Sequence, residues 1–225
     1  MENPASASMS DPVLVSVPVG AVNTSSTTIS FAKLVSIASL AALQAEVESL
    51  LLVSSEQNSW VDHVNKNDYS GGWDVLPLRC QRQHLDAHPI LQGFAIAEGD
   101  DWENLPVMVQ CPEIQQLLVQ LQCPIKAARL MRLKAGAEIK PHRDHELSIE
   151  FGEARLHLPI HTSDAVSFFV NHKKIPMRAG ELWYFNADQV HEVYNHGDED
   201  RINLVIDCTV NDWLRAQIQQ AVVHG

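Results

Sequence analysis

The stretch Ile139–Glu146, IKPHRDHE, concentrates histidine, arginine, lysine and acidic side chains around one proline. His142 and Asp144 stand two residues apart, so in an extended strand their side chains leave the same face, while Arg143 points the other way. Two such side chains can reach one metal ion. Because H-x-D patterns also occur by chance in solvated turns, a metal site requires a further ligand from a distant strand.

His191 is the best candidate for that ligand, because it begins a strand-like run, HEVYN. We expect the preceding run at 181–186, ELWYFN, to lie antiparallel to it. Two histidines and one carboxylate form the facial triad that binds non-haem Fe(II) and leaves three coordination positions open. A structural zinc site has four ligands, often cysteines, and no cysteine lies near these residues in sequence. The residue types therefore favour a catalytic metal.

Arg201 follows His191 by ten residues and begins the run RINLVIDC. In a strand, Arg201, Asn203, Val205 and Asp207 share one face, and the intervening apolar residues share the other. An arginine that points into a barrel needs an anion, because an unpaired buried charge is costly. A dicarboxylate co-substrate would supply that anion and accept two hydrogen bonds from the guanidinium.

The elements around these residues change character near residue 126. Before it we expect a lead at 1–30 that is flexible and contributes at most one strand, and then a mixed segment at 31–125 that shapes the substrate pocket. That segment should contain a helix at about 32–54, a Gly-Gly turn leading into a strand at 67–80, a loop at 97–106 and a short amphipathic helix at 111–123. A closing helix, capped by Asn211 or Asp212, should occupy 211–225.

Short alternating runs fill residues 126–210 and predict a sandwich or barrel of strands. Turns containing Gly, Pro, Asp or Asn separate most of them. The runs lie at 128–136, 154–161, 166–171, 181–186, 191–195 and 201–210.

Composition excludes several classes of function. The 225 residues carry a formal charge of −12, which argues against binding to nucleic acid or an anionic membrane. The apolar stretch Leu34–Val53 contains two glutamates, so we expect an amphipathic surface helix and no membrane span. The four cysteines form no C-x-x-C pattern and no leader precedes them, which predicts buried, reduced thiols in a cytoplasmic protein.

Residues 127–210 resemble the aspartyl/asparaginyl β-hydroxylase family of Fe(II)/2-oxoglutarate dioxygenases. The motifs that carry the resemblance are RLMRLKAGAEIKPHRD, ARLHLPI, GELWYFNADQVHEVYN and DRINLVID. The segment GGWDVLPLRC is similar to the early part of the bacterial proline cis-4-hydroxylase branch. The resemblance implies a mainly β fold with flanking helices, a double-stranded β-helix of the jelly-roll or cupin type.

The resemblance also implies roles for individual residues. It makes His142, Asp144 and His191 both the Fe(II) ligands and the catalytic residues. It makes Arg201 the residue that binds the distal carboxylate of 2-oxoglutarate. Arg155 matches a family position that helps to bind this co-substrate. His157, two residues after Arg155 and on the same strand face, matches a histidine that neighbours this position in the family. The reaction implied consumes O2, converts 2-oxoglutarate to succinate and hydroxylates an unactivated C–H bond.

Three functions stay open at this point. The first is hydroxylation of a free amino acid or a small amino-acid-like substrate. It is favoured because the sequence keeps the acidic ligand, Asp144, that the animal enzymes acting on epidermal growth factor-like domains lack, and because it has neither their membrane anchor nor their repeat region. The second is hydroxylation of Asp or Asn in a peptide or protein. The third is a non-catalytic cupin that binds a metal or ligand. A homodimer is compatible with all three.

Some residues have plainer explanations that compete with a site role. Arg155 could form a surface ion pair with Glu153, and His157 could be an ordinary core histidine. Arg79 and Arg129 could meet a substrate carboxylate or be ordinary surface arginines. Four aromatic residues are expected in the core, and one of them, Trp73, could lie over the mouth of the barrel; the four are Trp73, Trp183, Tyr184 and Phe185.

Overall fold

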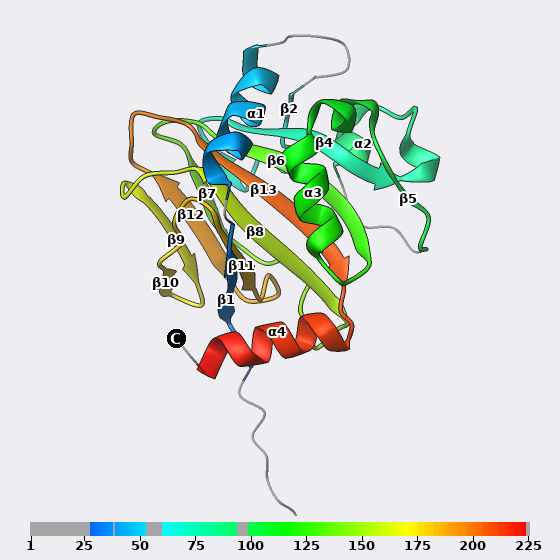
Figure 1. Ribbon diagram of the computed structural model, residues 1–225. Helices are drawn as coiled ribbons and strands as arrows, with labels where there is room; N and C mark the ends of the chain where they lie inside the picture. The colour runs from blue at the N-terminus through cyan, green and yellow to red at the C-terminus, as the bar shows by residue number, and fades with distance from the viewer. Residues whose placement is uncertain (1–27, 38, 53–59, 94–98, 224–225) are drawn as a thin grey trace, which may run out of the picture.

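The computed structural model describes residues 28–37, 39–52, 60–93 and 99–223. In this part of the chain two antiparallel sheets face each other (Figure 1). The larger sheet has the spatial order β1 (Phe31–Ser36), β11 (Glu181–Phe185), β8 (Glu153–His161), β13 (Arg201–Thr209), β6 (Ile125–Leu133), β4 (Trp73–Gln81) and β2 (Val61–Asp62), with β5 (Trp102–Asn104) paired to β4. The smaller sheet has the order β10 (Lys173–Ile175), β9 (Val166–Val170), β12 (His191–Asn195), β7 (Glu138–His142) and β3 (Tyr69–Ser70).

This arrangement is the predicted jelly roll, and the alternation along β13 explains how it divides apolar from polar side chains. Ile202, Leu204, Ile206 and Cys208 belong to a buried cluster on the outer face of the larger sheet. The alternate residues of β13, beginning at Arg201, face the space between the two sheets, as the sequence predicted. The outer face of the larger sheet is therefore apolar, and its inner face carries polar and charged side chains.

Helices cover the outer face of the larger sheet (Figure 1). They are α1 (Leu40–Leu52), α3 (Pro112–Gln120) and α4 (Asp212–Val223), with the short helices η1 (Arg82–His84), α2 (Pro89–Gln92) and η2 (Pro106–Gln110) nearer the β4–β5 end. The expected amphipathic helix is α3, which buries Ile114, Leu117 and Leu118. Asn211 caps α4, because its Oδ1 accepts a hydrogen bond from the Leu214 N–H at 3.0 Å.

Two sequence expectations about the N-terminal half were wrong. The helix expected at 32–54 begins only at Leu40, because residues 31–36 form the edge strand β1 and pair with β11. Pairing with a sheet edge overrides local helical propensity there. The loop expected at 97–106 contains β5, which pairs with β4. The flexible lead lies almost entirely outside the described residues, so it stays a prediction.

A third correction concerns how His191 is placed. Its strand, β12, does not pair with β11, since the two belong to opposite sheets. In a jelly roll successive strands cross between sheets, so sequence neighbours are not always partners in space. β12 lies between β9 and β7, and this brings His191 beside His142.

Two expectations drawn from composition can also be compared with the structure. The four cysteines are buried and free, as predicted. None of the helices in the described ranges is long and apolar enough to cross a membrane.

Candidate active site

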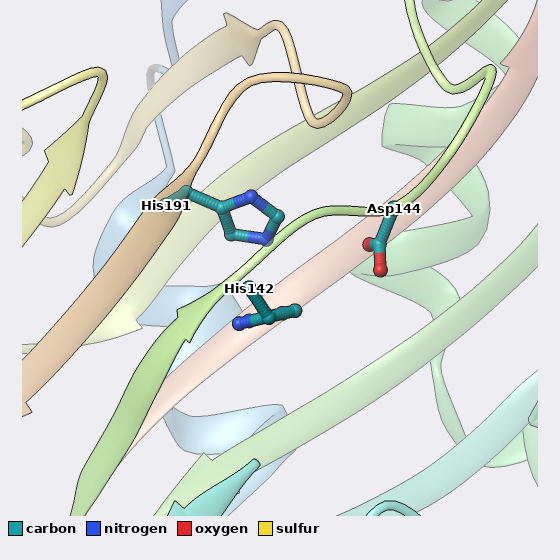
Figure 2. A group of neighbouring side chains, drawn as sticks. All are labelled: His142, Asp144 and His191. Atoms are coloured by element: carbon teal, nitrogen blue, oxygen red, sulfur yellow. The ribbon is translucent and has the colours of Figure 1, made fainter.

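Three predicted ligand residues meet at one end of the smaller sheet. His142 is the last residue of β7 and His191 is the first residue of β12, and their Cα atoms are cross-strand partners. One ligand atom from each histidine and one from Asp144 all lie within 4.8 Å of one another. Figure 2 shows the three side chains approaching a common space. Together they offer two imidazole nitrogens and one carboxylate oxygen, the donor set of a facial triad.

Asp144 reaches this space by a different route from the one that its spacing suggested. β7 ends at His142, so Asp144 lies in the turn beyond the strand. Its backbone N–H donates to the carbonyl of Ala187 at 2.9 Å. The prediction that His142 and Asp144 share one face of a strand is therefore wrong. The hydrogen bond to Ala187, in the connection between β11 and β12, positions Asp144 instead. Arg143 does point away, and its guanidinium binds Asp188 at 3.0 Å.

Backbone carbonyls orient both imidazole rings. Nδ1 of His142 lies 2.8 Å from the carbonyl oxygen of Lys140, and Nδ1 of His191 lies 3.0 Å from that of Gln189. A carbonyl only accepts, so each Nδ1 must carry the hydrogen and each Nε2 keeps a free lone pair. Burial and the neighbouring His142 lower the pKa of His191 to about 4. His191 is therefore neutral at pH 7, the state that binds a metal.

Arg155, on β8, connects the triad to the larger sheet. It donates to Asp207 from Nε at 2.7 Å and from Nη2 at 3.1 Å, and its Nη1 contacts the Asp144 carboxylate. Arg129 donates to the same Asp207 at 2.7 Å. The proposed surface pair of Arg155 with Glu153 does not form, because Glu153 pairs with Lys126.

These contacts keep both carboxylates ionised. Burial opposes ionisation of Asp144, but the charge of Arg155, and those of His191 and His142 when they are protonated, outweigh it and lower the pKa of that carboxyl. Burial also opposes ionisation of Asp207, and Arg129 and Arg155 together hold its pKa far below the usual range. An ionised Asp144 is the form that a cation requires.

Arg201 is buried at the first position of β13, and no carboxylate of the described residues pairs with it. Its Nη2 has no hydrogen-bond partner, and its guanidinium lies 5.9 Å from the Phe168 ring centroid. Burial lowers the pKa of Arg201 to about 10, which leaves it charged at neutral pH. Asn203, two residues on, is fully buried with both amide atoms unpaired. A charged group and an amide without partners fit an anionic ligand between the sheets.

Aromatic rings line the cavity between this region and the triad. The Phe185 ring lies 4.7 Å from the ring of His157 on the larger sheet and 5.1 Å from that of His191 on the smaller sheet. Phe168 packs against Phe185 at 5.0 Å. His157 is buried, Nδ1 of its ring has no partner, and burial together with Arg201 holds its pKa well below the usual value. It has aromatic neighbours like a core histidine, and it also lines the cavity.

A family model described as Aspartyl/Asparaginyl beta-hydroxylase matches residues 38–210. The chain belongs to this family. It is therefore a hydroxylase of the iron- and 2-oxoglutarate-dependent dioxygenase class.

Solved structures give more distant similarities to this β-hydroxylase family member. An oxidoreductase of the 2OG-Fe(II) oxygenase family from Burkholderia pseudomallei shows 14% identity over 73% of this chain and 78% of the other, with a TM-score of 0.45. A non-haem, α-ketoglutarate-dependent epimerase of nogalamycin biosynthesis shows 15% identity over 80% and 76%, with a TM-score of 0.47. A predicted oxalate decarboxylase from Thermotoga maritima shows 12% identity over 70% and 100%, with a TM-score of 0.39.

The site of this hydroxylase opens into a cavity of about 930 Å³. All three triad residues line it, as do the arginines at 129, 155 and 201. Arg79 does not line it and donates instead to Asn104 at 2.9 Å. Trp73 lies 7% exposed in the wall, so the core expectation holds, although its ring also contributes to the cavity.

Sequence reasoning missed the partner that holds two of these arginines. Asp207 was placed on the same strand face as Arg201, but it received no role. A signal was present, because a carboxylate on the inner face of a buried strand must be paired with a cation. His63 was also missed. It follows the two-residue strand β2, lines the cavity and belongs to no recognisable motif.

Proposed function

We propose that His142, Asp144 and His191 hold Fe(II) and that the enzyme hydroxylates an unactivated C–H bond of a free amino acid or small amino-acid-like substrate. The observation that carries this proposal is the convergence of the three ligand atoms within 4.8 Å, in one cavity with the unpaired Arg201. A cupin that binds only a metal would have no use for a buried guanidinium without a partner.

We assign 2-oxoglutarate to the space between the triad and Arg201. Arg201 would hold the distal carboxylate, because its Nη2 is buried and lacks an acceptor. Arg155 uses three of its five N–H groups on Asp144 and Asp207, so two remain for the near end of the co-substrate. The unpaired Nδ1 of His157 offers a further polar contact.

Bound iron, with 2-oxoglutarate and O2, supplies the oxidising power for hydroxylation, and 2-oxoglutarate leaves as succinate and carbon dioxide. The chain itself contributes geometry and charge. The carbonyls of Lys140 and Gln189 fix both histidine rings, and Arg155 restrains the Asp144 carboxylate. Phe168 and Phe185 keep water away from the inner end of the site, where Arg201 lies.

Charge in the cavity favours a substrate that carries a carboxylate. Three guanidiniums, those of Arg129, Arg155 and Arg201, lie with two carboxylates, the fully buried Asp207 and the partly exposed Asp144. The other acidic residues that line the cavity are exposed, apart from Glu153, which pairs with Lys126. Fe(II) and doubly ionised 2-oxoglutarate would cancel each other, so one positive charge would stay unbalanced. Arg129 spends one N–H on Asp207, and its buried Nε is unpaired. A substrate carboxylate near Arg129 would restore the balance.

The size of the cavity favours a second candidate, hydroxylation of Asp or Asn in a peptide. About 930 Å³ lies near the upper end of the range for small-molecule sites. The cavity also extends to Lys126, Glu153 and Thr209, and Thr209 lies eight residues along β13 from Arg201. Succinate release measured with free amino acids and with short Asp- or Asn-containing peptides separates the two candidates.

An anaerobic titration of the apoprotein with Fe(II) and then 2-oxoglutarate tests the proposal directly. We expect the visible charge-transfer band of the iron chelate in the wild type and its loss in His142→Ala and His191→Ala. His161→Ala is the matched control, because His161 ends β8 and does not line the cavity. Absence of the band in the wild type, or its persistence in both ligand variants, contradicts the proposed site.

A further inference from the structure

His63 lies in the wall of the active-site cavity, just beyond β2. Its backbone N–H donates to the carbonyl of Trp73 at 2.8 Å, which continues the pairing of β2 with β4. The same wall also contains apolar side chains that suit the aliphatic part of a substrate: Val61, Val64, Val75, Ile90 and Met131.

Aromatic packing fixes the plane of the His63 ring. It stacks on Trp73 with centroids 3.6 Å apart and planes 17° apart. Tyr69 meets both rings edge-on, at 6.5 Å from His63 and 5.7 Å from Trp73. The Tyr69 hydroxyl donates to the backbone carbonyl of His63 at 3.3 Å. The imidazole therefore has one face covered and little rotational freedom.

A local hydrogen bond determines which ring nitrogen carries the hydrogen. The backbone N–H of Asn65 donates to Nδ1 of His63 at 3.4 Å, so Nδ1 is the acceptor. In neutral imidazole the hydrogen then resides on Nε2. Within the described residues Nε2 has no hydrogen-bond partner, and it is not sealed from solvent as Nδ1 of His157 is. His63 thus offers a single N–H donor to the cavity.

The charges that face His63 favour an anionic acceptor. Burial, followed by the positive charges of Arg129 and Arg155, lowers the pKa of His63 to about 4, while Asp144 acts in the opposite direction and His142 adds to the lowering. His63 is therefore a neutral donor at pH 7. The two arginines that act on it also make this part of the cavity attractive to a carboxylate.

We propose that His63 is a substrate-binding residue whose Nε2–H donates a hydrogen bond to the carboxylate of the substrate. The proposal rests on the proposed function, because it places the same carboxylate near Arg129. Arg129 lies on β6 and His63 lies just beyond β2, so the two donors approach from opposite sides of β4. The substrate is then an aliphatic carboxylic acid whose carbon chain packs on the apolar wall.

Two substitutions at His63 separate the donor from the ring. His63→Phe keeps an aromatic ring on Trp73 and removes the N–H, whereas His63→Gln restores an amide N–H near the Nε2 position. The matched control is His196→Phe. The His196 ring also stacks on an aromatic residue, Tyr194, with centroids 5.7 Å apart and planes 6° apart, but His196 does not line the cavity.

The measurement is succinate release across the free L-amino acids, followed by kcat and KM for the best of them and for its carboxamide. We expect His63→Phe to raise KM about tenfold with little change in kcat, equivalent to about 1.4 kcal/mol. His63→Gln should recover part of the loss, and His196→Phe should match the wild type. The preference for the acid over the carboxamide should fall in His63→Phe.

The outcomes distinguish this proposal from the one on which it rests. If the charge-transfer band forms but His63→Phe leaves both KM and the preference for the acid unchanged, His63 does not bind the substrate. If His63→Phe loses the band itself, the residue acts on the iron centre and the proposal is overturned. Absence of the band in the wild type overturns the proposed function, and the role of His63 with it.

Discussion

Arg155 lies between Asp144 and Asp207 and donates hydrogen bonds to both carboxylates. Asp144 comes from the turn after β7, whereas Asp207 comes from β13 in the opposite sheet. One guanidinium therefore links the proposed iron ligand to a fully buried acid that touches no part of the metal site. Substitution of Asp207 should therefore affect mainly the stability of the fold, whereas substitution of Asp144 should affect mainly metal binding.

Asp207→Asn should be strongly destabilising. The substitution leaves Arg129 and Arg155 buried with one carboxylate fewer, and breaking a buried ion pair typically costs about 3–5 kcal/mol. Urea unfolding at pH 7 measures the loss. Asp62→Asn removes an exposed pair with Lys66 and serves as the control, with little change expected. Equal unfolding midpoints for the two variants would contradict the importance of the buried network.

His63 should make stability depend on pH between about 6.5 and 4. The unfolded chain binds a proton at this histidine below its ordinary pKa of 6.5, whereas the folded protein binds it only near 4. The unfolded state therefore holds more protons in this window, and stability falls as the pH falls through it, by up to about 3 kcal/mol.

The check is urea unfolding of the wild type and His63→Phe at several pH values from 7 to 4. The variant should lose less stability over this range, because it lacks the titrating group. A pH dependence identical to that of the wild type would show that His63 is already protonated in the folded protein at pH 6.

Asp144→Asn should weaken metal binding while preserving the fold. The amide still offers an oxygen to the metal and to Arg155, but the negative charge is lost. Affinity for Co(II), followed by its visible spectrum, should drop at least roughly tenfold. Thermal unfolding without metal reports on the fold. Unchanged Co(II) affinity would mean that Asp144 is not a ligand.

Arg201→Ala should weaken 2-oxoglutarate binding and leave iron bound. The guanidinium is buried without an anion, so its proposed partner is the distal carboxylate of the co-substrate. A charge-assisted hydrogen bond of this kind corresponds to at least about a tenfold change in Kd. Arg79→Ala, which removes an arginine outside the cavity, is the control. Loss of iron with unchanged 2-oxoglutarate affinity would reverse the assignment.

The sequence predicted the features that depend on local pattern. The alternation along β13 correctly separated the inner residues Arg201 and Asp207 from the outer apolar ones, and the position of His191 at the start of a strand was correct. In contrast, the Arg129–Asp207–Arg155 group depends on the register of three strands. No spacing in a single sequence determines that register.

The sequence also failed to predict features that depend on pairing between distant segments. Residues 31–36 form a strand because they pair with β11 at the edge of the larger sheet. The local sequence of this segment does not indicate that pairing. His63 acquired its position from a two-residue strand and from stacking on Trp73. Both cases reflect contacts between segments far apart in the chain.

The proposed iron ligands His142 and His191 belong to the smaller sheet, while Arg201, Arg155 and Arg129 belong to the larger one. Between the sheets stand Phe168 and Phe185, which contact His191 on one side and His157 on the other. In the proposed binding mode, 2-oxoglutarate would extend past these two rings from the triad to Arg201, so their bulk would set the distance that it must span. A substitution such as Phe185→Leu would change the distance between the metal site and the Arg201 guanidinium. It would remove no group that contacts the charges of the co-substrate. In that binding mode, Phe168 and Phe185 would select the chain length of the acid that the site accepts.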